Sequence, residues 1–267
     1  MLAAERILIT EVLDGESISA LNDDKLLAVV VRNFYRPELA EDLSSKILSS
    51  SEVAQYTHEL ADGDMLVQKY FGVDRLGFPF NLTYHAKEHD PLVEQYYREA
   101  RVGIERMRTL SAPGISPIDK LRLVLDEVYP DGATVAAFEG RKMLAGIGRI
   151  TKAELSYMSA EQPHFDALPE RYAQLDGQLA ANIYLKVPDK GGELELWDVA
   201  PVNPLSEAPE DWRAVLPQSI KIKPEVGDLV IFNCRRPHAV CEFQGDDRVS
   251  VQMFMGYQKD KALLLWN

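Results

Sequence analysis

Three side chains of this sequence have the types and the spacing of a metal-binding site. His164 and Asp166 lie one residue apart, directly after Pro163. In an extended segment, such side chains project to the same face, so the imidazole and the carboxylate can close on one ion. His238, which follows the apolar run 229–232, is the candidate third ligand. Two histidines and one carboxylate form a facial triad with open coordination positions, which suits non-haem Fe(II) and oxygen chemistry.

The order of the features downstream strengthens this interpretation. A His-x-Asp pair alone is a weak signal, because it commonly forms a turn or a solvated strand end, and His238 alone could be a strand-edge histidine. In chain order, the pair is followed by an apolar strand, Gly191-Gly192-Glu193-Leu194, Gly227-Asp228 before a second apolar strand, His238, and Arg248-Val249-Ser250. This ordered set, over roughly residues 134 to 267, resembles the Fe(II)/2-oxoglutarate-dependent oxygenase superfamily.

The resemblance implies a role for each of several residues. His164, Asp166 and His238 would hold Fe(II), with 2-oxoglutarate and O2 as cosubstrates. Arg248 matches the arginine that binds the distal carboxylate of 2-oxoglutarate, and an arginine suits that role because it is planar, permanently charged and two-pronged. An arginine in a surface turn is the alternative. Further matches to cosubstrate-binding positions are Ser250, Tyr184 and, less closely, Tyr157, although a buried tyrosine is as often part of the core.

Within the superfamily, the sequence is most similar to small-molecule tailoring enzymes, in particular to halogenases of indole alkaloids. The shared features are Glu139-Gly140-Arg141, Pro188-x-x-Gly191-Gly192-Glu193-Leu194, Gly227-Asp228-Leu229-x-x-Phe232-Asn233 and the final strand ending in Trp266. Those halogenases replace the carboxylate with Gly or Ala so that chloride can bind iron, whereas Asp166 occupies this position here. The resemblance therefore implies hydroxylation of a small metabolite, such as an amino acid derivative or a natural-product scaffold. Desaturation, cyclisation and a non-catalytic β-helix module that binds a ligand are the alternatives.

The composition limits the partners. A net charge of −13 disfavours nucleic acid and anionic membrane surfaces, because both bind clustered Lys and Arg. Cys234 and Cys241 are the only cysteines, and we expect reduced, partly buried thiols. The N-terminus lacks the layout of a signal peptide, and no apolar run approaches the roughly 18 residues of a spanning helix. We therefore expect a cytoplasmic protein with a small-molecule substrate; the oligomeric state is not predicted.

The first half of the chain predicts a strand and three helices. Residues 26–34 are rich in β-branched side chains and favour a strand. Helices are expected from Pro37 onward, over 90–110 and over 117–128, from apolar residues at helical spacing. The segment 51–88 is rich in turns and aromatic residues, and the resemblance implies a substrate lid there. His58 and His85 lie in this segment, and His89 follows it directly. All three lack acidic or thiol partners at ligand spacing, so we expect them at the surface.

After residue 132 the pattern changes to short strands separated by turns. Strands are predicted at 134–138, 141–150, 153–159, 179–187, 193–198, 219–223, 228–233, 238–243, 248–257 and 262–266. Regular spacing of this kind predicts a barrel or sandwich. The acidic insert 201–217 is predicted to be a loop. Candidate substrate contacts, for each of which a structural role is favoured, are Arg141, Arg149, Trp197 and Trp212.

The predicted fold class is α+β, mainly β. The resemblance makes the core a double-stranded β-helix, the jelly-roll or cupin-like form, flanked by N-terminal helices. Residues 1–267 would form a single oxygenase domain, in which 1–132 supply an N-terminal strand with a helical support and lid region, and 133–267 form the core.

Overall fold

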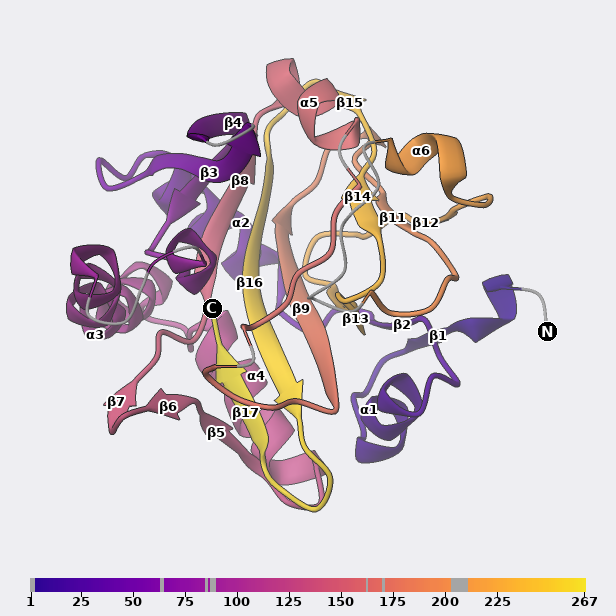
Figure 1. Cartoon of the computed structure of the whole chain (residues 1–267), viewed down its shortest axis with the longest axis horizontal. Helices are drawn as coiled ribbons and strands as arrows, with labels where there is room; N and C mark the ends of the chain where they lie inside the picture. The colour runs from indigo at the N-terminus through magenta and orange to yellow at the C-terminus, as the bar shows by residue number, and fades with distance from the viewer. Residues whose placement is uncertain are drawn as a thin grey trace.

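A ten-stranded sheet is the frame of the molecule (Figure 1). The computed structural model describes residues 3–62, 65–84, 86, 90–161, 163–169, 171–202 and 211–267. In spatial order the strands are β1 (Ile7–Thr10), β2 (Ala28–Val31), β13 (Leu229–Asn233), β9 (Gly177–Lys186), β16 (Arg248–Tyr257), β8 (Ile147–Thr151), β4 (Met65–Leu76) and β3 (Ala54–Asp62), with β17 (Leu263–Trp266) beside β16 and β5 (Ala133–Val135) beside β17. The pairs β1–β2 and β17–β5 are parallel and the others are antiparallel.

Smaller sheets lie against this frame. They comprise β12 (Ile220–Ile222), β11 (Leu194–Leu196) and β14 (His238–Val240); β10 (Lys190–Gly191) and β15 (Phe243–Gln244); and β6 (Ala137–Phe138) and β7 (Arg141–Lys142). Leu194, Leu196 and Ile222 belong to one buried apolar cluster with Ala180 of β9 and Val230 of β13. The small three-stranded sheet is therefore held to the large one by burial of apolar side chains.

Helices α1 (Gly15–Asn22), α2 (Pro37–Leu48) and α4 (Pro117–Val128) cover the opposite face of the large sheet. The other helices are α3 (Pro91–Ser111), α5 (Ser156–Ala160) and α6 (Trp212–Val215), and the 3-10 turns are η1 (Ala3–Arg6), η2 (Phe80–Thr83) and η3 (Ala153–Leu155). Leu43 of α2 and Leu121 of α4 share a buried cluster with Val249 and Val251 of β16. Side chains alternate along a strand, so Arg248, Ser250 and Gln252 project away from the helices.

Most of the predicted elements are confirmed, including the strand within 26–34 and the helices α2, α3 and α4. The coarse class, mixed α and β with mainly sheet, is also confirmed. The predicted strand 153–159 is wrong, because η3 and α5 occupy this segment; a short run with few apolar residues does not separate strand from helix. The predicted strand 141–150 is likewise two strands, β7 and β8.

The segment 51–88 contains regular structure that the sequence did not reveal. It forms the hairpin β3–β4, which joins the large sheet through β8, and then η2. His85 and His89 lie outside the described residues, as does the side chain of His58. In the predicted loop 201–217, residues 201–202 and 211–217 are described, and the latter contain the short helix α6. Among the described residues, no helix is both long enough and apolar enough to cross a membrane.

Candidate metal centre

The backbone brings His164, Asp166 and His238 together. His164 and His238 form an isolated antiparallel bridge, in which each N–H donates to the carbonyl of the other, at 3.0 and 2.8 Å. The N–H of Asp166 donates to the carbonyl of Cys234 at 2.8 Å, which holds the segment beside the turn that precedes β14. The candidate ligand atoms of the three side chains all lie within 4.8 Å of one another.

Hydrogen bonds orient two of these side chains. The Nδ1 atom of His238 lies 2.9 Å from the carbonyl of Arg236, so with its proton there His238 keeps Nε2 as a ligand. That Nε2 is 3.4 Å from Oδ2 of Asp166. The Nδ2 atom of Asn81, in η2, donates to Oδ1 of Asp166 at 3.0 Å. Oδ2 is buried, and at the 3.4 Å separation it makes no aligned hydrogen bond, so it is available to a cation.

The electrostatics of the cluster favour an ionised carboxylate. Burial by itself would raise the pKa of Asp166, but the close approach of His238 and the positive charges around the carboxylate, including that of Arg149, outweigh it and hold the pKa well below its ordinary value. His164 is exposed, Asp166 is half-buried and His238 is buried, so the cluster opens to solvent on one side. An anionic oxygen and two imidazoles around an accessible position fit Fe(II).

A buried arginine anchors the turn before His238. Arg236 is 3% exposed and forms an ion pair with Asp24, which follows α1, and another at 3.4 Å with Asp198. Arg6 of η1 contacts the same two carboxylates, at 2.7 and 2.6 Å. The carbonyl of Arg236 accepts the hydrogen bond from Nδ1 of His238. The ion pairs of Arg236 therefore link the N-terminal segment to the orientation of a candidate ligand.

Arg248, Ser250 and Tyr184 lie together on the inner face of the large sheet. Ser250 pairs with Tyr184 across β16 and β9, and both are buried, as is Arg248 at 5% exposure. The Arg248 Cζ atom lies 4.7 Å from the centroid of the Tyr184 ring. Burial raises the pKa of Tyr184, opposed by the charge of Arg248, and the hydroxyl makes no aligned hydrogen bond. Among the described residues no carboxylate lies within ion-pair distance of Arg248, so this guanidinium can receive an anion.

Tyr157 lies in a different setting. It is on α5 rather than on a strand, and its side chain is 44% exposed, whereas Tyr184 is fully buried. The alternation argument that places Arg248 and Ser250 on one face therefore does not extend to Tyr157. Its role as a cosubstrate contact stays a prediction.

Two of the candidate substrate contacts have structural partners. Arg141 forms an ion pair with Glu94 at 2.6 Å, with its Cζ 4.1 Å from the Tyr97 ring centroid. Trp197 is buried beneath Arg213. Trp212 is on α6, with its ring centroid 6.5 Å from that of Phe165, and Arg149 lies on the inner face near Asp166.

Sequence reasoning missed the contribution of the β3–β4 hairpin and η2. Asn81 holds Asp166, and Tyr56 is buried within reach of the charges of Arg149, Asp166 and Arg75. No local signal identifies these residues, because their relation to Asp166 arises only when β4 pairs with β8.

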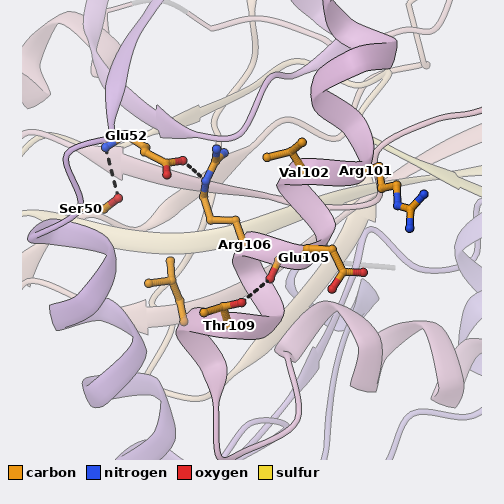
Figure 2. Close-up of a pocket in the computed structure, with 8 residues that line it drawn as sticks. Ser50, Glu52, Arg101, Val102, Glu105, Arg106 and Thr109 are labelled. Atoms are coloured by element: carbon orange, nitrogen blue, oxygen red, sulfur yellow. Dashed lines mark hydrogen bonds and ion pairs between the residues drawn. The ribbon is translucent and has the colours of Figure 1, made fainter.

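Two surface cavities lie away from the triad. Figure 2 shows one, of about 520 Å³, beside α3, with the ion pair of Glu52 and Arg106 and the hydrogen bond from Thr109 to the Glu105 carbonyl at 2.9 Å. The other, of about 900 Å³, lies between α3, α4 and β5–β7. Neither is lined by a triad residue, so neither defines the candidate metal centre.

The sheet-rich fold and the clustered ligand types are those of a non-haem iron protein. Residues 154–256 match the model of the 2OG-Fe(II) oxygenase superfamily, which agrees with the resemblance seen in the sequence. Together with the clustered ligand types, this match identifies a 2-oxoglutarate-dependent dioxygenase that uses Fe(II), 2-oxoglutarate and O2.

Individual proteins are similar to this chain in fold or in sequence. The crystal structure of an N-substituted L-amino acid dioxygenase from Burkholderia ambifaria AMMD superposes with a TM-score of 0.61 at 16% identity, over 95% of this chain and 91% of that chain. The same dioxygenase in complex with alpha-KG gives a TM-score of 0.58 at 14% identity, over 95% and 91%. Leucinostatins biosynthesis cluster protein S of Purpureocillium lilacinum is 25% identical over 180 residues, 60% of this chain and 73% of that protein.

Proposed function

We propose that this dioxygenase hydroxylates an unactivated C–H bond of a small metabolite, on a double-stranded β-helix in which His164, Asp166 and His238 hold the iron. The observation that carries the proposal is the cluster of their ligand atoms within 4.8 Å. Asp166 fills the coordination position that a halide would otherwise need, so oxygen transfer rather than halogenation is the expected outcome.

The roles of the surrounding residues follow from their positions. When bound, Fe(II) and 2-oxoglutarate supply oxidation of the substrate by O2, with succinate and CO2 as coproducts. Arg248 binds the distal carboxylate of 2-oxoglutarate through a charge-assisted, two-pronged contact. Tyr184 and Ser250 lie beside it on the same face and offer hydroxyl donors. The buried sheet interior shields the side of Arg248 and Tyr184 from water, and bound substrate would cover the open side at His164.

The comparisons support an amino acid derivative or a peptide-like natural product as the substrate. One structural neighbour is a dioxygenase of N-substituted L-amino acids, and a curated relative belongs to a leucinostatins biosynthesis cluster. From these two similarities we infer that the substrate of this chain is also an amino acid derivative or a peptide-like compound.

A metabolite screen tests the proposal. The iron-loaded protein is incubated with 2-oxoglutarate, O2 and a library that includes N-substituted amino acids, and succinate and product masses are measured. We expect succinate release stimulated by a substrate that gains one oxygen atom. Loss of two hydrogens would indicate desaturation or cyclisation, and a gain of chlorine would contradict the role of Asp166.

Two variants make the result specific. Asp166→Ala is expected to abolish succinate release, whereas Asp189→Ala, at an exposed carboxylate before β10, is expected to retain it. Equal activity of the two variants would overturn the assignment of Asp166.

A further inference from the structure

A row of polar residues crosses four strands on the inner face of the large sheet. Arg75 of β4 pairs with Arg149 of β8, Arg149 pairs with Ser250 of β16, and Ser250 pairs with Tyr184 of β9. Directly paired residues project to the same face of a sheet. Arg75 and Arg149 therefore lie on the face that carries Arg248, opposite the helices.

Arg149 is close enough to the candidate ligand Asp166 and to Arg248 for its charge to act on both. Its Nη1 donates to Oε1 of Gln252 at 2.7 Å, and its Cζ is 5.5 Å from the centroid of the Tyr56 ring. A group bound to Arg149 would thus lie near both the iron and the cosubstrate.

Arg75 extends this positive region toward the β3–β4 hairpin. Its Nη1 donates to the carbonyl of Gly77 at 2.7 Å, and its Cζ is 5.0 Å from the centroid of the Phe78 ring. Its Nε is buried without a hydrogen-bond partner. Burial lowers the pKa of Arg75, opposed by the charges of Tyr56 and Glu99.

Neither Arg75 nor Arg149 has a carboxylate within ion-pair distance among the described residues. The charge of Glu99 acts on Arg75 from beyond that distance. Other arginines of the chain do have ion-pair partners, including Arg32, Arg106, Arg108, Arg141, Arg213 and Arg236. Asp166 is close enough to feel Arg149, but the metal would claim its free oxygen.

In the loaded site, these two cations have no ion-pair partner in the part of the chain that the structure describes. In the proposed function, Fe(II) is balanced by Asp166 and the keto acid end of 2-oxoglutarate, and the distal carboxylate of 2-oxoglutarate is balanced by Arg248. Arg75 and Arg149 then contribute two positive charges to a partly buried face, where only the more distant charges of Glu99 and Asp166 oppose them among the described residues. Such charges are stable beside a bound anion, and guanidinium groups match the planar, two-oxygen geometry of a carboxylate.

We propose that Arg75 and Arg149 bind a carboxylate of the substrate, so that the enzyme acts on carboxylic acids. Tyr56, buried beside Arg149, adds a hydroxyl at the edge of the same site. The inference rests on the proposed function, because it places the substrate on the face that carries the iron ligands. It predicts that an acid is selected over its uncharged amide.

Binding measurements test this inference without turnover. The full-length protein, loaded with Mn(II) and 2-oxoglutarate under anaerobic conditions, is titrated calorimetrically with N-acylated L-amino acids and with their primary amides. We expect acids to bind and their amides to bind about 10- to 100-fold more weakly, since a charge-assisted contact is lost. Arg149→Gln and Arg75→Gln should reduce the affinity for the acid and remove the preference for acid over amide. Arg98→Gln, at an exposed position on α3, should preserve both.

Affinity for 2-oxoglutarate separates this site from the cosubstrate site. Arg248→Gln should weaken 2-oxoglutarate binding, and Arg149→Gln should weaken acid binding much more than 2-oxoglutarate binding. Parallel loss of 2-oxoglutarate in both variants would assign Arg149 to the cosubstrate and overturn the inference. Equal binding of acids and amides, or no binding of any acid in the panel, would also overturn it.

Failure of the inference and failure of the proposed function give different results. Iron-dependent succinate release without selection of acids leaves the oxygenase and removes the carboxylate site. Selective binding of acids without any succinate release removes the hydroxylase proposal instead.

Discussion

At the scale of single residues, the carboxylate of Asp166 has a divided role. Oδ1 accepts a hydrogen bond from Asn81, whereas Oδ2 faces Nε2 of His238. Fixing one oxygen leaves the other directed toward the two imidazoles. A neutral donor also leaves the charge of the carboxylate in place, which a cation needs.

Asn81→Leu is predicted to weaken metal binding without unfolding the protein. The substitution removes the donor to Oδ1, and loss of a hydrogen bond to a ligand commonly costs about 10- to 100-fold in metal affinity. Calorimetric titration of the apo protein with Mn(II) measures the change. Asp166→Ala is the reference for complete loss of the ligand, and unchanged affinity in Asn81→Leu would contradict the orienting role.

At the scale of elements, close packing at turns positions the strands of the site. Gly227, with φ +89°, immediately precedes the Asp228–Asn233 run that contains β13, and its carbonyl accepts the N–H of Tyr35 at 2.8 Å. A Cβ atom at Gly227 would lie 2.2 Å from the carbonyl oxygen of Tyr35. Only glycine allows both this conformation and this approach.

Gly227→Ala is therefore predicted to destabilise the fold strongly. The clash with Tyr35 adds to the strain of a positive φ, and we expect a loss of at least about 3 kcal/mol in the free energy of unfolding. Gly140→Ala is a matched control, because Gly140 has φ +75° and open space around its Cβ position. It should cost only about 1 kcal/mol. Urea unfolding compares the two, and equal losses would contradict the packing argument.

The element α6 is tied to the small sheet through a buried carboxylate, Glu195 of β11. Arg213 and Ser219 donate to Glu195 at 2.8 and 2.6 Å. Burial raises the pKa of Glu195, but these hydrogen bonds and the nearby charges outweigh it, so the pKa in the folded protein is lowered. A lowered pKa means that Glu195 stabilises the fold above its unfolded-state pKa and loses this effect as pH falls through the folded-state value.

Glu195→Gln is predicted to cost most at neutral pH and progressively less in acid. At pH 7 the variant should lose about 1–2 kcal/mol, because a charge-assisted pair becomes a neutral one. The difference from wild type should shrink as the pH falls below the ordinary pKa of 4.5. Chemical unfolding over a pH series measures this difference, and a difference independent of pH would refute the prediction.

At the scale of the whole molecule, strands from the first and second halves of the sequence lie side by side around the candidate site. β1 and β2 extend the sheet beside β13, and the hairpin β3–β4 extends it beside β8. Arg6 and Asp24 reach the turn before His238 through Arg236. The large sheet therefore contains strands from both predicted parts of the chain, 1–132 and 133–267. The organisation as a single domain stays a prediction.

Ligand loading is predicted to stabilise the molecule as a whole. A ligand that binds only the folded state adds about 2.7 kcal/mol at 100 times its Kd. Mn(II) with 2-oxoglutarate should therefore raise the Tm of the wild-type protein by several degrees in a thermal melt. Asp166→Ala should lose the response to the metal, and Arg248→Gln should lose the added response to 2-oxoglutarate. A full response in either variant would contradict the assigned ligand.

The sequence alone determined the features that local chemistry controls. Ligand types and their spacing singled out His164, Asp166 and His238 as candidate ligands, and side-chain alternation placed Arg248 and Ser250 on one face. Apolar periodicity identified α2, α3 and α4, because a helix must bury one stripe of its surface.

Only the tertiary structure decided what lies around the candidate ligands. Strand pairing places Arg75 opposite Arg149, and the position of η2 brings Asn81 to Asp166 across 85 residues of sequence. No local pattern encodes such relations, because partner choice between distant strands depends on burial over the whole sheet. Residues 153–159 form η3 and α5 rather than a strand, and their sequence did not show this because a short run with few apolar residues does not separate helix from strand.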